Sequence, residues 1–142
     1  MNCIVVFGTR PEIIKLSPLF ELLHKEFNAK FVHTGQHYSY ELDRIFFDDL
    51  RLRSPDYILD AGSTTHGRQV GLMLLKLDSI IQKEKPDFVL VLGDTNSTLS
   101  GGLIAAKSGV YLAHLEAGCR SFNREMPEEI NRIIADHTAD YL

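Results

Sequence analysis

Three carboxylates stand where a protein could use them for proton transfer. Asp94 follows the apolar run 88–92, separated from it by one glycine. Glu116 ends a second apolar run, and Glu128 lies near the start of a predicted helix. Carboxylates that meet at one place push at least one pKa upward, which supplies an acid beside a base. The pattern indicates acid–base chemistry, with Asp94, Glu116 and Glu128 as candidate catalytic residues.

Two of these acids, Asp94 and Glu128, also have a purely structural explanation. Asp94 can cap the helix that follows it. Acidic residues in a first helical turn complement the helix dipole, which accounts for at least one of Glu128 and Glu129. Glu128 can also pair with Arg132, four residues further along the same helix. Taken singly, none of these residues establishes a function.

Basic side chains that could hold an anion follow the first apolar run. In the segment 8–12, Thr9 and Glu12 fit a capping box that opens a helix. A helix N-terminus offers free N–H groups and a partial positive charge, both suited to phosphate. Arg10 adds a planar cation there, and Lys15 lies one turn further along. We predict anion binding at this strand end. Because the glycine fingerprints of dinucleotide-binding proteins and P-loop enzymes are missing, neither class is expected.

The composition narrows the possible partners and cofactors. The chain has 142 residues and a net charge of −4, which disfavours a general nucleic-acid binder but leaves room for a small anion. No apolar run is long enough to cross a bilayer, and the first residues lack the features of a secretory signal. The six histidines show no zinc-site spacing, so no metal is predicted. The two cysteines suggest no disulfide framework. We expect a cytoplasmic protein.

Strands and helices are predicted to alternate. The predicted strands are 3–7, 31–33, 88–92 and 110–115, with a further short strand at 57–59. The predicted helices are 13–27, 40–50, 70–81 and 98–107, with another from 127 onward. Strands that are apolar on both faces suit a parallel sheet covered by helices, here an α/β, doubly wound Rossmann-like sheet.

In such sheets, ligands bind beyond the carboxyl ends of the strands. The three candidate acids are therefore expected around one crevice. The basic residues Arg10, Lys15 and Arg132 are candidates for the same place. A new apolar run begins at 140–142 and would add a further sheet position. We interpret Leu142 as a truncation boundary.

Five segments together resemble the non-hydrolysing UDP-N-acetylglucosamine 2-epimerases, in that family's order and spacing. They are Gly8-Thr9-Arg10-Pro11-Glu12-Ile13-Ile14-Lys15, Thr34-Gly35-Gln36-His37, Gly93-Asp94-Thr95-Asn96, His114-Leu115-Glu116-Ala117-Gly118-Cys119-Arg120 and Pro127-Glu128-Glu129-Ile130-Asn131-Arg132. The match runs from Cys3 to Leu142. It implies a two-domain fold of the glycosyltransferase-B type. Residues 1–142 would form the N-terminal Rossmann-like domain with the catalytic carboxylates, and the C-terminal UDP-binding domain is absent from this chain.

The resemblance also implies an activity. The family interconverts UDP-N-acetylglucosamine and UDP-N-acetylmannosamine, eliminating UDP to give 2-acetamidoglucal and adding it back, with no cofactor. Without the second domain, which supplies most of the UDP site and a further histidine, this chain alone is expected to be inactive or nearly so. A homodimer is expected for the full-length enzyme.

The resemblance assigns roles to individual positions of this chain. Asp94, Glu116 and Glu128 match catalytic positions, and Arg10, Lys15 and Arg132 match basic active-site positions. Gln36 and His37 are further candidate substrate-binding residues. Bacterial members build an allosteric site around this Gln-His pair, but the stretch 38–40 differs here, which puts allosteric control in doubt.

Three alternatives stay open. A relative that epimerises a UDP-diacetamido-glucuronic acid has a similar N-terminal half, and the loop 120–124 resembles both groups. A hydrolysing epimerase would release free N-acetylmannosamine. A non-catalytic nucleotide-sugar-binding domain is the third, although pure binding would not need three carboxylates near an anion.

Overall fold

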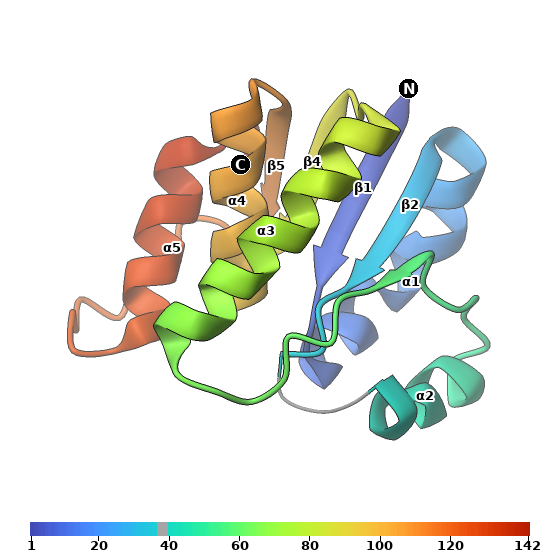
Figure 1. Cartoon of the computed structure of the whole chain (residues 1–142), viewed down its shortest axis with the longest axis horizontal. Helices are drawn as coiled ribbons and strands as arrows, with labels where there is room; N and C mark the ends of the chain where they lie inside the picture. The colour runs from blue at the N-terminus through green and yellow to red at the C-terminus, as the bar shows by residue number, and fades with distance from the viewer. Residues whose placement is uncertain (37–39) are drawn as a thin grey trace.

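The computed structural model describes residues 1–36 and 40–142 and shows one parallel sheet covered by helices on both faces (Figure 1). The strands are β1 (Asn2–Phe7), β2 (Asn28–His33), β3 (Tyr57–Ile58), β4 (Phe88–Leu92) and β5 (Tyr111–Leu115). The helices are α1 (Arg10–Glu26), α2 (Tyr40–Asp49), α3 (His66–Glu84), α4 (Asn96–Ser108) and α5 (Pro127–Thr138). All five strands run parallel in the order β3-β2-β1-β4-β5, which confirms the predicted doubly wound fold.

The chain reverses its direction of travel across the sheet between β1 and β4. It starts at β1 in the centre, moves outward through β2 to β3, and then crosses back to β4 and β5. This reversal is the topological switch point, where open α/β sheets leave a crevice at the carboxyl ends of the strands. The loops after β1 and β4 therefore face each other across the crevice.

Alternate side chains of β1 enter two separate apolar layers. Cys3, Val5 and Phe7 pack in the layer that includes α1, whereas Ile4 and Val6 pack in the layer that includes α3 and α4. Figure 1 shows α3 and α4 on the near side of the sheet. Both faces are buried, which explains why the strand reads as a continuous apolar run.

Two glycines allow elements to approach closely behind the crevice. A Cβ at Gly101 of α4 would lie 2.7 Å from Cγ1 of Val91 and 3.3 Å from Cβ of Val6, so this helix packs directly on the sheet. A Cβ at Gly8 would lie 1.8 Å from Oγ1 of Thr34 and 2.4 Å from Oγ of Ser97. The loops that follow β1 and β2 and the start of α4 therefore touch.

Element boundaries differ from the predictions in small ways. Strand β2 begins at Asn28 rather than at residue 31, because polar Asn28 and Lys30 alternate with buried side chains at its start. Helix α4 begins at Asn96 rather than at residue 98, because the side chain of Thr95 caps it. The apolar run predicted at 140–142 pairs with the outer edge of β5, where Tyr141 bridges Ala113.

None of the helices in the described part of the chain is both long and apolar enough to cross a bilayer.

Candidate active site

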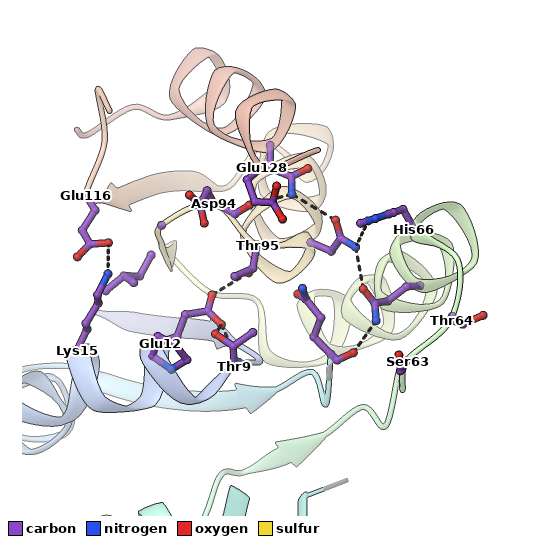
Figure 2. Close-up of a pocket in the computed structure, with 17 residues that line it drawn as sticks. Thr9, Glu12, Lys15, Ser63, Thr64, His66, Asp94, Thr95, Glu116 and Glu128 are labelled. Atoms are coloured by element: carbon purple, nitrogen blue, oxygen red, sulfur yellow. Dashed lines mark hydrogen bonds and ion pairs between the residues drawn. The ribbon is translucent and has the colours of Figure 1, made fainter. Parts of the chain in front are cut away.

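A cavity of about 520 Å³ opens at the carboxyl ends of β1, β4 and β5 (Figure 2). Asp94, Glu116 and Glu128 all line it, although 22 residues separate the first two along the chain and they come from different loops. Lys15 and Gln36 line it as well. The predicted meeting of the three acids is therefore confirmed. Their roles in catalysis stay predictions.

Arg132 contacts the carboxylate of Asp94 through two nitrogens of its guanidinium group. Its Nε and Nη2 lie 3.0 and 2.5 Å from Oδ2 of Asp94, and its Nη1 lies 2.9 Å from Oε2 of Glu129. The pairing of Arg132 with Glu128 that the helical spacing allows is not formed. Glu129, three residues before Arg132, takes that place instead. Arg132 does not itself line the cavity but contacts the carboxylates of Asp94 and Glu129; its role in substrate binding stays a prediction.

Of the two adjacent acids Glu128 and Glu129, Glu129 has a structural role. It is 1% exposed, and its carboxylate accepts hydrogen bonds from the backbone and hydroxyl of Ser121 and from the backbone of Phe122. The Ser121 N–H above all lowers the pKa of Glu129 to about 2, against the opposing effect of burial and with help from Arg132. Glu128 is exposed and, within the described chain, forms no ion pair, so its carboxylate is left to the cavity.

Glu116 is held by Lys15 across the mouth of the cavity. The Nζ–Oε2 distance is 2.8 Å, and both side chains are about half exposed (Figure 2). The backbone of Glu116 has φ 62°, a left-handed conformation that costs a residue with a Cβ about 1–2 kcal/mol. Such strain persists only where the surroundings fix the residue, and it gathers at functional sites.

Glu12 lines the cavity, a position that the capping-box interpretation did not anticipate. Its Oε2 accepts hydrogen bonds from the backbone of Gly8, at 2.9 Å, and from the backbone and hydroxyl of Thr9, both at 2.8 Å. Its Oε1 accepts one from the hydroxyl of Thr95 at 2.8 Å. Complete burial raises the pKa of Glu12, although these four bonds oppose the shift.

This arrangement changes the expectation for phosphate at the start of α1. The N–H groups of Gly8 and Thr9 already donate to Glu12, so the prediction of free N–H groups is wrong at these two residues. The carboxylate of the capping box has taken the place that a phosphate oxygen would need.

A chain of amides lies along the floor of the cavity. Gln69 donates from Nε2 to the carbonyls of Gln36 and Gly62, at 2.7 and 2.5 Å, so its Oε1 accepts from Nδ2 of Asn96 at 2.7 Å. Asn131 donates to the carbonyl of Asp94 at 2.9 Å and to Oδ1 of Asn96 at 3.2 Å. Carbonyls only accept, so the orientation of all three amides is fixed.

The amide chain also fixes the tautomer of His66, the first residue of α3. Nδ2 of Asn96 lies 3.0 Å from Nδ1 of His66, so that ring nitrogen accepts. A neutral His66 then carries its proton on Nε2. Because His66 lines the cavity, it is a candidate donor to a ligand. Asn96 and Asn131 lie in two of the segments that resemble the family but had no predicted role. His66 and Gln69 were not singled out, since their contacts with Asn96 span 30 and 27 residues.

The remaining predicted residues fall in different places. Gln36 is buried and accepts, through Oε1, from the backbone and hydroxyl of Ser97 at 3.0 and 2.9 Å. His37 lies outside the described residues. The structure does not bring Arg10 to the cavity. As the first residue of α1 it extends toward α2, where its Nε lies 3.9 Å from Asp43 and its guanidinium 5.7 Å from the ring centre of Phe46.

Residues 1–36 and 40–142 contain no cluster of three or more His, Cys, Asp or Glu side chains that could hold a metal ion.

Comparison with known proteins places this geometry in context. A family model described as UDP-N-acetylglucosamine 2-epimerase matches residues 21–142. The UDP-N-acetylglucosamine 2-epimerase of Methanocaldococcus jannaschii is 52% identical over 143 residues, covering 100% of this chain and 39% of that protein. The UDP-2,3-diacetamido-2,3-dideoxy-D-glucuronate 2-epimerase of Pseudomonas aeruginosa is 47% identical, covering 100% of this chain and 41% of that protein.

The solved structures agree with these sequence relatives. The M. jannaschii UDP-GlcNAc 2-epimerase, solved in complex with UDP-GlcNAc and UDP, superposes with a TM-score of 0.95 at 52% identity, covering 100% of this chain and 40% of that one. A Streptomyces glycosyltransferase superposes with a TM-score of 0.53 at 22% identity over 80% of this chain, a likeness of fold alone. The chain spans about two fifths of the length of the relatives it matches.

Proposed function

Because the chain belongs to the UDP-N-acetylglucosamine 2-epimerase family, we propose that the complete polypeptide interconverts UDP-N-acetylglucosamine and UDP-N-acetylmannosamine by inverting C2 of the sugar. The observation that carries the proposal is the meeting of Asp94, Glu116 and Glu128 around one cavity. The rest of the polypeptide supplies the larger part of the UDP site.

The reaction needs a departing UDP because the hydrogen at C2 is not next to a carbonyl. When the bond between C1 and the UDP oxygen breaks, C1 gains oxocarbenium character and a base removes the C2 proton. A double bond forms between C1 and C2, giving 2-acetamidoglucal and UDP. For the return, an acid delivers a proton to the opposite face of C2 as the UDP oxygen bonds to C1. The protein must place proton-transferring groups on both faces and stabilise the diphosphate.

The residues of the cavity fit these requirements. Asp94, Glu116 and Glu128 provide proton transfer and charge stabilisation, with Asp94 held by Arg132 and Glu116 by Lys15. Lys15 and Gln36, which line the cavity, are proposed to contact the substrate. Arg10 and His37 keep the substrate-binding roles that the family resemblance implies.

The test is solvent-deuterium incorporation. In deuterated buffer, the complete polypeptide given UDP-N-acetylglucosamine should yield both epimers with deuterium at C2. The substitutions Asp94→Asn, Glu116→Gln and Glu128→Gln should each slow this strongly. Asp78→Asn, which changes an exposed acid on α3 three turns from the cavity, serves as the control. Absence of C2 deuterium with the wild-type polypeptide would refute the proposal.

A UDP-diacetamido-glucuronic acid is a second candidate substrate, favoured by the 47% identity to the P. aeruginosa enzyme. Competition between the two UDP-sugars in one assay separates the candidates, because the true substrate has the higher kcat/KM.

We further expect the reaction to take place in the cytoplasm, since Cys3 and the exposed Cys119 are both free thiols that suit a reducing compartment. The family resemblance leads us to expect a homodimer, which sedimentation equilibrium of the complete polypeptide would test.

A further inference from the structure

A buried histidine and a partly buried aspartate lie beneath the segments that carry the proposed catalytic acids. His114 in β5 is 2% exposed. Its Nδ1 lies 2.6 Å from Oδ1 of Asp136 in α5, and its Nε2 lies 2.7 Å from the carbonyl of Gly93. The other oxygen of Asp136 accepts from the backbone of Gly118 at 3.0 Å and from Nη1 of Arg120 at 2.6 Å. The pair of His114 and Asp136 thus joins β5, α5 and the turns at Gly93 and at Gly118.

Two of these contacts are to backbone groups beside the acids. Gly93 directly precedes Asp94, and Gly118 follows Glu116 by two residues. The turn that carries Glu116 is in a conformation that needs support, because φ is 62° at a residue with a Cβ, whereas Gly93 adopts its φ of 74° without such strain. His114 donates a hydrogen bond to the carbonyl of Gly93, and Asp136 accepts one from the N–H of Gly118. Together these two bonds fix the two turns relative to each other.

Asp136 also connects the two turns to helix α5, which carries the third acid, Glu128. It lies on α5 one turn after Arg132, which contacts Asp94, and two turns after Glu128. Helix α5 is therefore tied to the strand ends at two levels, through Asp136 and through Arg132. Neither His114 nor Asp136 belongs to the two apolar clusters that form the core of the described chain.

The donors in this link can be assigned. The carbonyl of Gly93 only accepts, so Nε2 of His114 carries a proton. A single proton lies between Nδ1 and Asp136. Burial acts to raise the pKa of Asp136, but hydrogen bonds from Arg120, Gly118 and His114 outweigh it and hold the pKa below its usual value. Nε2 is therefore the assigned donor, and the hydrogen bond between Nδ1 and Asp136 holds the ring in that orientation.

We infer that His114 is a positioning residue for the proposed epimerisation: it donates from Nε2 to the carbonyl of Gly93 and is hydrogen-bonded through Nδ1 to Asp136, and so sets Asp94 and Glu116 at their working separation. The inference rests on the proposed function and adds to it a residue that does not touch the substrate. Misplacement of reacting groups by about 1 Å costs on the order of 100-fold in rate.

Two substitutions separate the two bonds. His114→Gln keeps an amide donor near the position of Nε2 and loses the bond to Asp136. His114→Asn keeps one near Nδ1 and loses the bond to Gly93. In the complete polypeptide, each should lower kcat by about 10- to 100-fold and change KM by less than about threefold, since the side chains that contact the sugar nucleotide are intact. His137→Gln, an exposed neighbour of Asp136 on α5, should leave both constants unchanged.

Two further measurements keep the inference open to refutation. Thermal unfolding identifies the temperature at which each variant is folded, and kcat is compared there. A folded variant of either kind with kcat within about twofold of wild type would overturn the positioning role. Nitrogen NMR of the His114 ring in the wild-type polypeptide should show Nε2 protonated at neutral pH, and an unprotonated Nε2 would overturn the assignment. The NMR result does not depend on activity, so it remains decisive if the wild type fails to epimerise.

Discussion

Replacing Glu12 by Ala and by Gln separates two tasks that this buried carboxylate performs. The side chain is 2% exposed and accepts four hydrogen bonds, three of them at Oε2 from Gly8 and Thr9. Alanine removes every acceptor. Glutamine keeps the shape and one oxygen, which can take the place of Oε2 and retain the three bonds.

The expected cost follows from the groups left behind. With Glu12→Ala, the backbone N–H groups of Gly8 and Thr9 lose their acceptor, and an unpaired buried N–H costs about 1–3 kcal/mol. Water from the cavity can reach part of the space, which favours the low end, a loss of about 2–3 kcal/mol in the free energy of unfolding. With Glu12→Gln, the new NH₂ meets the hydroxyl of Thr95, which can turn its hydrogen toward Thr98, 3.2 Å away. The expected change is within about 1 kcal/mol.

The pH dependence tests the buried charge. Burial raises the pKa of Glu12 above its ordinary value of 4.5, so the folded chain takes up this proton more readily than the unfolded chain. The contribution of Glu12 to stability is therefore most favourable below the unfolded pKa and is lost as the pH rises through the folded pKa. Glutamine does not titrate. The stability of wild type relative to Glu12→Gln should fall as the pH rises from about 4 toward neutrality.

Urea unfolding of the three proteins between about pH 4 and pH 8 measures both effects. Equal losses in the Ala and Gln variants would refute the hydrogen-bond explanation. A difference between wild type and Glu12→Gln that stays constant with pH would refute the raised pKa.

Two further outcomes are expected from single changes. Gly101→Ala should destabilise the fold by about 1–3 kcal/mol, because the new methyl would lie 2.7 Å from Val91. The matched control Gly71→Ala, on an open face of α3, should stabilise the fold by about 0.5–1 kcal/mol. Urea unfolding measures both changes. Glu129→Gln should weaken the dependence of the free energy of unfolding on pH at acidic pH, the acid limb of the stability curve. In wild type the contribution of Glu129 is present above its ordinary pKa of 4.5 and is lost as the pH falls toward about 2, which unfolding between pH 2 and pH 6 would show; an unchanged limb would contradict the role of this side chain.

The strand ends were predictable because two simple rules apply to them. Runs such as 88–92 are apolar on both faces, so they had to lie inside a covered parallel sheet. Residues that directly follow such strands face the crevice at the switch point, so Asp94 and Glu116 could be expected together without any knowledge of the contacts. These rules depend only on neighbours in the sequence.

Predictions that depended on side-chain direction were weaker. Glu128 and Glu129 are adjacent and equally acidic, but about 100° of helix rotation separates them, so one faces the cavity and the other the loop after β5. Arg10 has the right charge and position, but as the first residue of α1 it extends toward Asp43 and Phe46. Both outcomes are set by tertiary packing.

The polar network beneath the cavity could not be predicted at all. Gln69, Asn96 and Asn131 contact one another across three helices, and each is an ordinary residue for the first turns of a helix. His66 gains a defined tautomer only through Asn96. The rule for strand ends brings residues to one crevice but does not say which side chains bond to one another, so the donors of the cavity floor became visible only in three dimensions.

The charges that line the cavity are too negative to stabilise the departing diphosphate of the proposed reaction. Lys15 is the only Lys or Arg among the described lining residues, and it already pairs with Glu116. The two helix-start N–H donors of Gly8 and Thr9 are taken by Glu12. A diphosphate that entered beside Asp94, Glu116 and Glu128 would meet more negative than positive charge. We therefore expect its cations to come from the length that the relatives have beyond this chain, with the proton-transferring acids supplied here.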